Sequence, residues 1–286
     1  MQLATISTTS GDRAVAVRDG KYIDLIQADP QLPRSLKEIL TRDNGLAQAR
    51  SAAERGLAAD MFVTGRLLAP VQSPGKVICI GLNYRDHAAE SGVEPPPEPV
   101  VFNKFPQSVI GPEEPIRIPA VCQQVDYEAE LVVVIGKRGK HIPRASAFTH
   151  VAGYMNGNDV SSRDWQSHKP GKQWLLGKSP DTFAPTGPWL LTADEVPDSR
   201  NLSIKLRLNG QTMQNSSSYE LIFGVDELIA YVSQLVMLEP GDLIFTGTPP
   251  GVGMARKPPV WLKPGDVCEV EITGLGILKN PVMADA

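Results

Sequence analysis

The sequence predicts an α+β fold that is mainly β, with a small N-terminal α+β domain at residues 1–70 and a larger domain at residues 71–286. The chain has 286 residues, which is enough for one large domain and a smaller one. It contains 25 Gly and 25 Pro, and this density of turn-forming residues favours β structure over long helices. A Pro-Gly-Asp turn precedes an apolar run at Pro240 and again at Pro264, as expected for strands that cross a barrel-like roll.

Charge and apolar content exclude several classes of protein. The formal net charge of −4 gives no basic face for nucleic acid, and no apolar run reaches the length of a membrane span. The first residues lack the basic and apolar regions of a secretion signal, and the three cysteines have no motif spacing, as is typical of thiols in a reducing compartment. We therefore expect a cytoplasmic protein whose partner is a small molecule, not nucleic acid or a membrane.

The N-terminal region predicts a hairpin followed by helices. Two alternating runs between Ala14 and Leu25 meet at Asp19-Gly20, a dipeptide that favours a tight hairpin turn. Residues 35–56 have a helical composition with a break at Asn44-Gly45. Pro70 to Gly75 is expected to be a polar linker to the second domain.

A short strand and a short helix open the second domain. Residues 77–82 predict a buried strand, and Asn83 can cap a helix from Tyr84 to Ser91. On that helix His87 and Glu90 are three residues apart, so they share a face and can hydrogen-bond. A carboxylate that holds one imidazole nitrogen leaves the other free to accept a proton, although such a pair is more often a surface pair. The prolines that follow predict an exposed segment, and a lid over a catalytic site is one use of it.

Val125 to Gly136 predicts a strand that carries two acids. Leu131 to Ile135 is an aliphatic run that is mostly β-branched. Because alternate side chains of a strand lie on the same face, Glu128 and Glu130 point into one small volume. Buried carboxylates need protons, cations or a metal ion, and the alternative is an exposed strand face beside lysines.

A third acid favours the metal ion. Asp159 lies among small and turn-forming residues, which can bring its side chain toward Glu128 and Glu130. Three carboxylates suit Mg²⁺ or Mn²⁺, one ion per subunit, and no histidine or cysteine has the spacing of a zinc site.

Two lysines and one loop can supply further polar groups. Lys178 lies between Leu-Leu-Gly and Ser-Pro, so it can balance carboxylate charge or stabilise an oxyanion, unless it is exposed on a loop. Lys104 ends a short strand that begins at Val100, and it is expected to be solvated, with contact to an anion as the alternative. Thr246 to Gly253 can approach a carboxylate substrate with backbone amides, or it can be only a turn.

The C-terminal third predicts more strands and one helix. Asn201 to Gly210 alternates apolar and polar residues and ends in an Asn-Gly hairpin turn. Asp226 can cap a helix with an apolar stripe that includes Leu228 and Val232.

Five blocks, in this order, resemble the fumarylacetoacetate hydrolase family and span roughly residues 77–279. The blocks are Gly-Leu-Asn-Tyr-Arg-Asp-His-Ala-Ala-Glu at 81–90, Asp-Tyr-Glu-Ala-Glu-Leu at 126–131, Asn-Asp-Val-Ser-Ser-Arg-Asp-Trp-Gln at 158–166, Gln-Trp-Leu-Leu-Gly-Lys at 173–178 and Phe-Thr-Gly-Thr-Pro-Pro-Gly-Val-Gly at 245–253. The resemblance implies a mixed β-sandwich roll with a small N-terminal domain, usually assembled as a homodimer.

The resemblance also implies roles for particular residues. The implied metal ligands are Glu128, Glu130 and Asp159, and the implied catalytic residues are His87, Glu90 and Lys178. The candidate substrate-binding residues are Arg85, Lys104, Arg163, Gln166 and Thr248.

The close spacing of His87 and Glu90 is similar to the acylpyruvate hydrolase branch of the family. The first hypothesis is therefore a metal-dependent hydrolase that cleaves the C3–C4 bond of a 2,4-diketo acid and releases pyruvate. A 2,4-diketo-3-deoxy sugar acid of the L-rhamnonate or L-fuconate type, which would give pyruvate and lactate, is the first choice of substrate. One alternative is an oxaloacetate decarboxylase or tautomerase that uses the same metal-enolate chemistry. Another is a non-catalytic sugar-acid binding protein that a metal stabilises.

Overall fold

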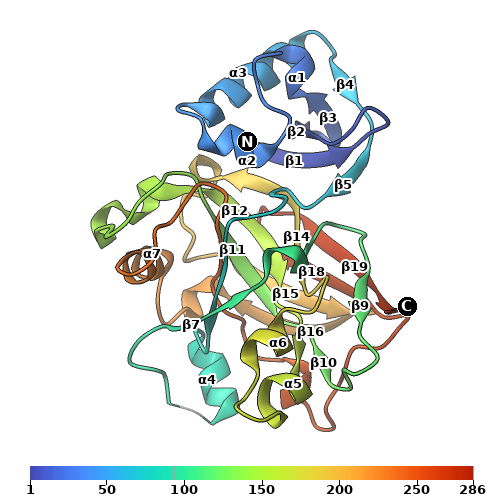
Figure 1. Ribbon diagram of the computed structural model, residues 1–286, viewed down its shortest axis with the longest axis vertical. Helices are drawn as coiled ribbons and strands as arrows, with labels where there is room; N and C mark the ends of the chain where they lie inside the picture. The colour runs from blue at the N-terminus through green and yellow to red at the C-terminus, as the bar shows by residue number, and fades with distance from the viewer. Residues whose placement is uncertain (93, 286) are drawn as a thin grey trace.

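The computed structural model describes residues 1–92 and 94–285, which form a strand-rich body with a smaller N-terminal lobe (Figure 1). The lobe contains β1 (Gln2–Ser7), β2 (Arg13–Arg18), β3 (Lys21–Asp24), α1 (Leu25–Ala28), α2 (Leu36–Thr41), α3 (Gly45–Ala58), β4 (Phe62–Val63) and β5 (Arg66–Leu68). The turn between β2 and β3 has positive φ at Asp19 and Gly20, 49° and 74°, as a tight hairpin requires. The two main helices of the lobe lie on either side of Asn44, as predicted.

The body contains the remaining strands and helices. The first half has β6 (Val77–Gly81), α4 (Arg85–Ser91), β7 (Val100–Lys104), β8 (Val109–Ile110), β9 (Ile116–Ile118), β10 (Val125–Asp126), β11 (Ala129–Ile135) and β12 (Val151–Asn158). The second half has β13 (Ser161–Ser162), α5 (Arg163–His168), α6 (Trp174–Lys178), β14 (Ala184–Thr192), β15 (Ser203–Leu208), β16 (Gln211–Ser217), α7 (Val225–Ser233), β17 (Leu243–Phe245), β18 (Val267–Ile272) and β19 (Ile277–Ala284). Short 3₁₀ turns occupy Pro106–Ser108, Arg144–His150, Ala193–Glu195, Ser218–Glu220 and Gly253–Ala255.

One large sheet runs through both the lobe and the body. Its main path is β4-β3-β2-β1-β14-β12-β11-β17-β6-β7, and β1 joins the body through pairs such as Gln2 with Leu191. A second sheet has the order β16-β15-β18-β19-β9. The expected polar linker is partly interior, because Val71 is fully buried in the core that the lobe shares with the body. The predicted domain boundary at residue 70 stays a prediction.

Strand β11 lies at the centre of this architecture. It pairs with β12 on one side and with β17 on the other. Leu131 and Val133 pack into the core between the sheets, while Val132 and Val134 pack into the core that faces the N-terminal lobe. Burial of both faces explains why the strand is a continuous aliphatic run.

Three helices lie in the half of the body that is farther from the N-terminal lobe. They are α4, α5 and α6 (Figure 1). Among the described residues, no helix combines the length and the apolar character needed to cross a bilayer.

Two predicted helix caps are wrong. Helix α4 starts at Arg85, and the Asn83 side chain donates to the carbonyl oxygens of Phe223 and Thr246 and accepts from the Phe223 N–H. The N-cap of α7 is Gly224, while Asp226 lies inside the helix and pairs with arginines. Both side chains therefore interact with groups from distant segments and cap neither helix.

Asn83→Ala should lower the free energy of unfolding by roughly 3 kcal/mol, because it leaves three buried backbone groups without their partner. Urea denaturation followed by fluorescence measures the change. Asn215→Ala, at an exposed position of β16, is the control and should leave stability within about 0.5 kcal/mol. Equal stability of the two variants would contradict a stabilising role for the hydrogen bonds of Asn83.

Candidate metal centre and active site

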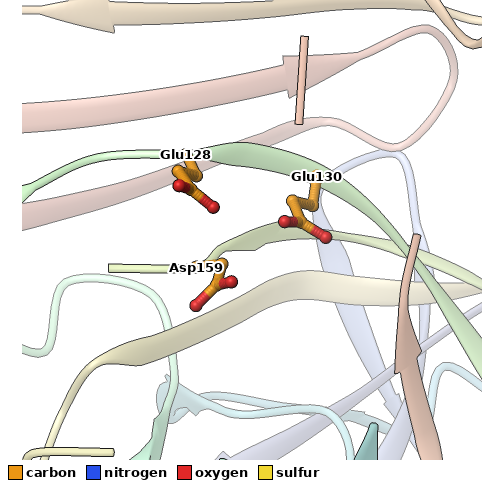
Figure 2. Close-up of side chains that lie close together, drawn as sticks. All are labelled: Glu128, Glu130 and Asp159. Carbon is orange, nitrogen blue, oxygen red and sulfur yellow. The ribbon is translucent and has the colours of Figure 1, made fainter. Parts of the chain in front are cut away.

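Three buried carboxylates converge at one end of β11 and β12. One oxygen from each of Glu128, Glu130 and Asp159 lies within 4.8 Å of the others (Figure 2). The antiparallel pairing of Ala129 with Asn158 places the residues at these strand ends side by side, and Asp159 N–H donates to the Glu128 carbonyl at 2.9 Å. The observed strand is shorter than the predicted one. Strand β11 begins at Ala129, and Glu128 lies just before it.

Lys178 connects two of the three acids. Its ammonium donates to Glu128 Oε2 at 3.0 Å and to Asp159 Oδ2 at 2.7 Å, and it lies 4.9 Å from the centre of the Phe102 ring. Burial lowers the pKa of Lys178, but the Asp159 and Glu128 carboxylates outweigh burial, and the net shift is upward. Lys178 is therefore a buried ammonium with one N–H left for another acceptor.

Arg163 holds Glu128 from the other side. Its Nε donates to Asp126 at 2.9 Å, its Nη2 donates to Glu128 Oε1 at 2.5 Å, and its Nη1 donates to Gln166 Oε1 at 2.9 Å. Burial raises the pKa of Glu128, yet Lys178 and Arg163 more than offset it and bring that pKa to about 2. Glu128 is therefore an ionised carboxylate.

Asp126 was missed as a site residue. It is fully buried, and besides Arg163 it accepts the N–H groups of Gly253 and Met254. It thereby fastens the loop after the Thr-Gly-Thr-Pro-Pro segment to Arg163 and the acidic cluster. The available signal was its place two residues before Glu128, in the same alternation as Glu128 and Glu130.

Lys104 lies at the back of the acidic cluster. It is buried and donates to Asp159 Oδ1 and to the Val160 carbonyl oxygen. Burial lowers the pKa of Lys104, and Asp159 raises it, with a net downward shift. The expectation of a solvated lysine is wrong, because Lys104 is buried; the alternative holds, and the anion is the Asp159 side chain.

Glu130 is the acid without a cation of its own. Among the described residues it accepts the Gly247 N–H at 2.7 Å and forms no ion pair. Burial, Asp159 and Glu128 raise its pKa well above the usual value. The cluster thus contains four carboxylates against three cations: Asp126, Glu128, Glu130 and Asp159 against Lys104, Arg163 and Lys178.

This donor set fits a hard divalent cation. A buried carboxylate in excess costs several kcal/mol unless it is neutralised. The three converging carboxylates offer only oxygen ligands, which Mg²⁺ and Mn²⁺ prefer. Glu128, Glu130 and Asp159 are the residues that would hold the ion.

His87 and Glu90 form a pair beside this centre. His87 Nδ1 lies 3.3 Å from Glu90 Oε2, and both Glu90 oxygens accept the Gly251 N–H at 3.1 Å. Asp86 accepts the Ser216 hydroxyl at 2.6 Å, which ties the same helix to β16. The expected lid helix is thus fastened over the site at both ends, with His87 facing inward.

A cavity of about 370 Å³ has both the His87–Glu90 pair and Glu128, one of the three converging acids, in its lining. Its lining includes His87, Glu90, Glu128, Arg163, Gln166, Lys178 and Thr248, with Phe102 and Trp174 as an aromatic wall. Three of the five substrate-binding candidates, Arg163, Gln166 and Thr248, therefore line one cavity with the catalytic candidates.

Two substrate-binding candidates lie elsewhere. Arg85 points away from the cavity and donates to the carbonyl oxygens of Tyr219 and Leu221. It occupies the opposite side of α4 from His87, since a shift of two residues rotates a helix by more than half a turn. Lys104 is buried and does not line the cavity. Neither position supports a substrate contact.

The comparisons define the class of protein. Residues 76–283 match the family described as Fumarylacetoacetate (FAA) hydrolase C-terminal, and the chain belongs to the fumarylacetoacetate hydrolase family. Oxaloacetate tautomerase fahd2, mitochondrial, of Xenopus laevis is 50% identical over 268 residues, covering 92% of this chain and 83% of that protein. Human oxaloacetate tautomerase FAHD2A, mitochondrial, is 48% identical over 268 residues, covering 92% of this chain and 84% of the relative.

Solved structures agree with this assignment. A putative HpcE protein from Mycobacterium smegmatis superposes with a TM-score of 0.89 at 38% identity, with all of both chains covered. Fumarylacetoacetate hydrolase from Exiguobacterium antarcticum gives 0.85 at 35% identity, also with all of both chains covered. The predicted family and the predicted α+β, mainly β fold are confirmed. The cytoplasmic location stays a prediction, which the names of the mitochondrial relatives do not support.

Mn²⁺ should stabilise the protein against heat. The reason is that only the folded state brings the three carboxylates together, so the ion binds the folded state and not the unfolded chain. At a concentration of 100 Kd the gain is about 2.7 kcal/mol. Glu130→Gln should abolish the gain while leaving the metal-free protein no less stable, since it removes the one acid without a cation. Differential scanning calorimetry with and without Mn²⁺ measures both effects.

Glu54→Gln, at an exposed position of α3, is the matched control and should keep the full metal response. A metal response that survives in Glu130→Gln would show that the ion binds elsewhere.

Proposed function

We propose that this protein is an oxaloacetate tautomerase, which interconverts the keto and enol forms of oxaloacetate. The observation that carries the proposal is the identity of 48–50% with proteins named oxaloacetate tautomerase, over 92% of this chain. The site supports it, since tautomerisation moves one proton between C3 and the oxygen on C2 and needs one base beside an enolate-stabilising centre.

Glu128, Glu130 and Asp159 would hold the divalent cation that the family commonly uses, and such an ion would supply Lewis-acid stabilisation of the charge on the C2 oxygen. The cations of the cluster would hold these carboxylates in position for the ion. Lys178 and Arg163 keep Glu128 ionised and fixed, and Lys104 fixes Asp159 from behind. The ligands are thereby oriented before any substrate enters.

His87 is the proposed base. Glu90 accepts the Nδ1–H of His87, so Nε2 carries the lone pair that removes the proton from C3 of the keto form. The imidazolium then gives a proton to the C2 oxygen, and the enol results. The reverse sequence returns the keto form with His87 restored, so protons and electrons balance.

Lys178 and Gln166 are the proposed substrate contacts. Two N–H groups of Lys178 are engaged with Glu128 and Asp159, and the third is available to a substrate oxygen. Gln166 Oε1 accepts from Arg163, which leaves its amide N–H groups as donors at the cavity wall. The hydroxyl of Thr248 already donates to the Ala129 carbonyl, so its part is to shape the cavity.

Cleavage of a 2,4-diketo acid is the second candidate. The 35% identity with a solved fumarylacetoacetate hydrolase favours it, and the same His87 could activate a water molecule. The first hypothesis, a sugar-acid hydrolase, has weaker support than the tautomerase, because the relatives of higher identity are named oxaloacetate tautomerases. Oxaloacetate decarboxylation would use the same enolate.

With Mg²⁺ or Mn²⁺ present, the protein should accelerate loss of the ultraviolet absorbance of enol-oxaloacetate without releasing pyruvate. The reason is that tautomerisation breaks no carbon–carbon bond. A coupled lactate dehydrogenase assay measures pyruvate in parallel, with oxaloacetate and an acylpyruvate as alternative substrates. Pyruvate release from the acylpyruvate, with no change in enol decay, would favour the hydrolase instead.

His87→Ala should reduce turnover by roughly 10²- to 10⁴-fold, because it removes the general base. Glu90→Gln should reduce turnover less, since it only weakens the orientation of the imidazole. The Mn²⁺ response in calorimetry should persist in both variants. His150→Ala, which removes an imidazole that contacts the Lys137 carbonyl, is the control. Unchanged turnover in His87→Ala would refute the assignment of the base.

A further inference from the structure

A second cavity, of about 650 Å³, adjoins the catalytic cavity. The two share the side chains of Glu90 and Ala255 in their walls. The other walls of the second cavity come from the turn between β15 and β16 and from the segment between Ala255 and Asp266. A ligand in this space would therefore lie against the carboxylate that orients His87.

The charges on the second cavity are predominantly positive. Its lining carries Arg256, Lys257 and Lys263, and in the described chain none of these side chains forms an ion pair. The two acids of the lining are already engaged. Asp266 accepts from Asn209 Nδ2 and from Lys263 N–H, both at 2.9 Å, and Glu90 accepts from Gly251 and meets His87. These donors are neutral, so the three cations of the lining exceed its two acids by one charge.

Arg256 is the cation of the lining whose direction is fixed by the protein. Its Nη2 donates to the Met213 carbonyl oxygen, which fixes the direction of the guanidinium. Arg256 lines the cavity, and the guanidinium has five N–H donors, so donors remain for an oxygen of a ligand. Carboxylate and phosphate oxygens are the acceptors that match a guanidinium best.

The size and lining of the cavity favour an organic anion. A volume of about 650 Å³ is in the range of small-molecule sites. Trp261, Met213 and Val260 add apolar surface beside the cations. A simple inorganic ion would leave most of that surface without contact.

We propose that this second cavity binds a small organic anion, whose carboxylate or phosphate group is held by Arg256 with Lys257 and Lys263 at the rim. The site is separate from the one that holds the reacting keto acid and does not depend on which reaction the protein catalyses. A bound anion places a negative group beside Glu90. Anion binding is thereby linked to the His87–Glu90 pair.

Isothermal titration of malonate and of inorganic phosphate into the metal-free protein of residues 1–286 tests the proposal. Saturable binding of at least one probe is expected in the wild type. Arg256→Gln should weaken it by about tenfold or more, because a charge-assisted hydrogen bond is lost. Arg138→Gln, which removes an exposed arginine paired with Glu239, is the charge-matched control and should bind as the wild type does.

Two more variants separate the remaining possibilities. Lys263→Gln changes an exposed side chain that a folded protein tolerates, and it should weaken binding even where Arg256→Gln proves unstable. Gln166→Ala alters the catalytic cavity alone and should leave binding unchanged. The proposal is overturned if the wild type binds neither probe saturably, if both cation variants bind normally, or if only Gln166→Ala loses binding.

Discussion

A carboxylate without a cation is the constraint on which the rest of this site depends. Four buried acids meet three buried cations, and Glu130 is the acid left over. Ion pairs within a fold usually balance, because an uncompensated charge away from water is costly. The imbalance is therefore best understood as a place prepared for a divalent ion, around which Lys104, Arg163 and Lys178 hold the other acids in position.

Contacts of α4 with β16 and with the Gly251 loop hold His87 beside the acidic cluster. Helix α4 follows β6, and it is fastened to β16 by Asp86 and to the Gly251 loop by Glu90. The same loop is fastened to Asp126 through the N–H groups of Gly253 and Met254. Base, loop and acidic cluster thus form one connected unit, and Glu90 belongs to both of the cavities that meet there.

Local patterns in the sequence predicted much of this arrangement. The aliphatic run of β11, the Asp19-Gly20 hairpin and the close pairing of His87 with Glu90 depend on neighbours in the chain, so spacing alone reveals them. The three acids could be placed together because Glu128 and Glu130 alternate in one extended segment and turn-forming residues surround Asp159, and the family resemblance implied the same three residues. What spacing could not reveal was which distant partner takes each side chain. Asn83, Arg85 and Lys104 are held by segments 55 or more residues away, and the pairing of β1 with β14 is equally non-local.

The most direct test of the central claim is a crystal structure of the protein grown with Mn²⁺, in which anomalous scattering locates the ion. The account predicts one ion per chain, bound by carboxylate oxygens of Glu128, Glu130 and Asp159, with His87 facing it across the cavity. An ion bound elsewhere, or no ion at saturating Mn²⁺ with Glu130 still held by Gly247 alone, would contradict it.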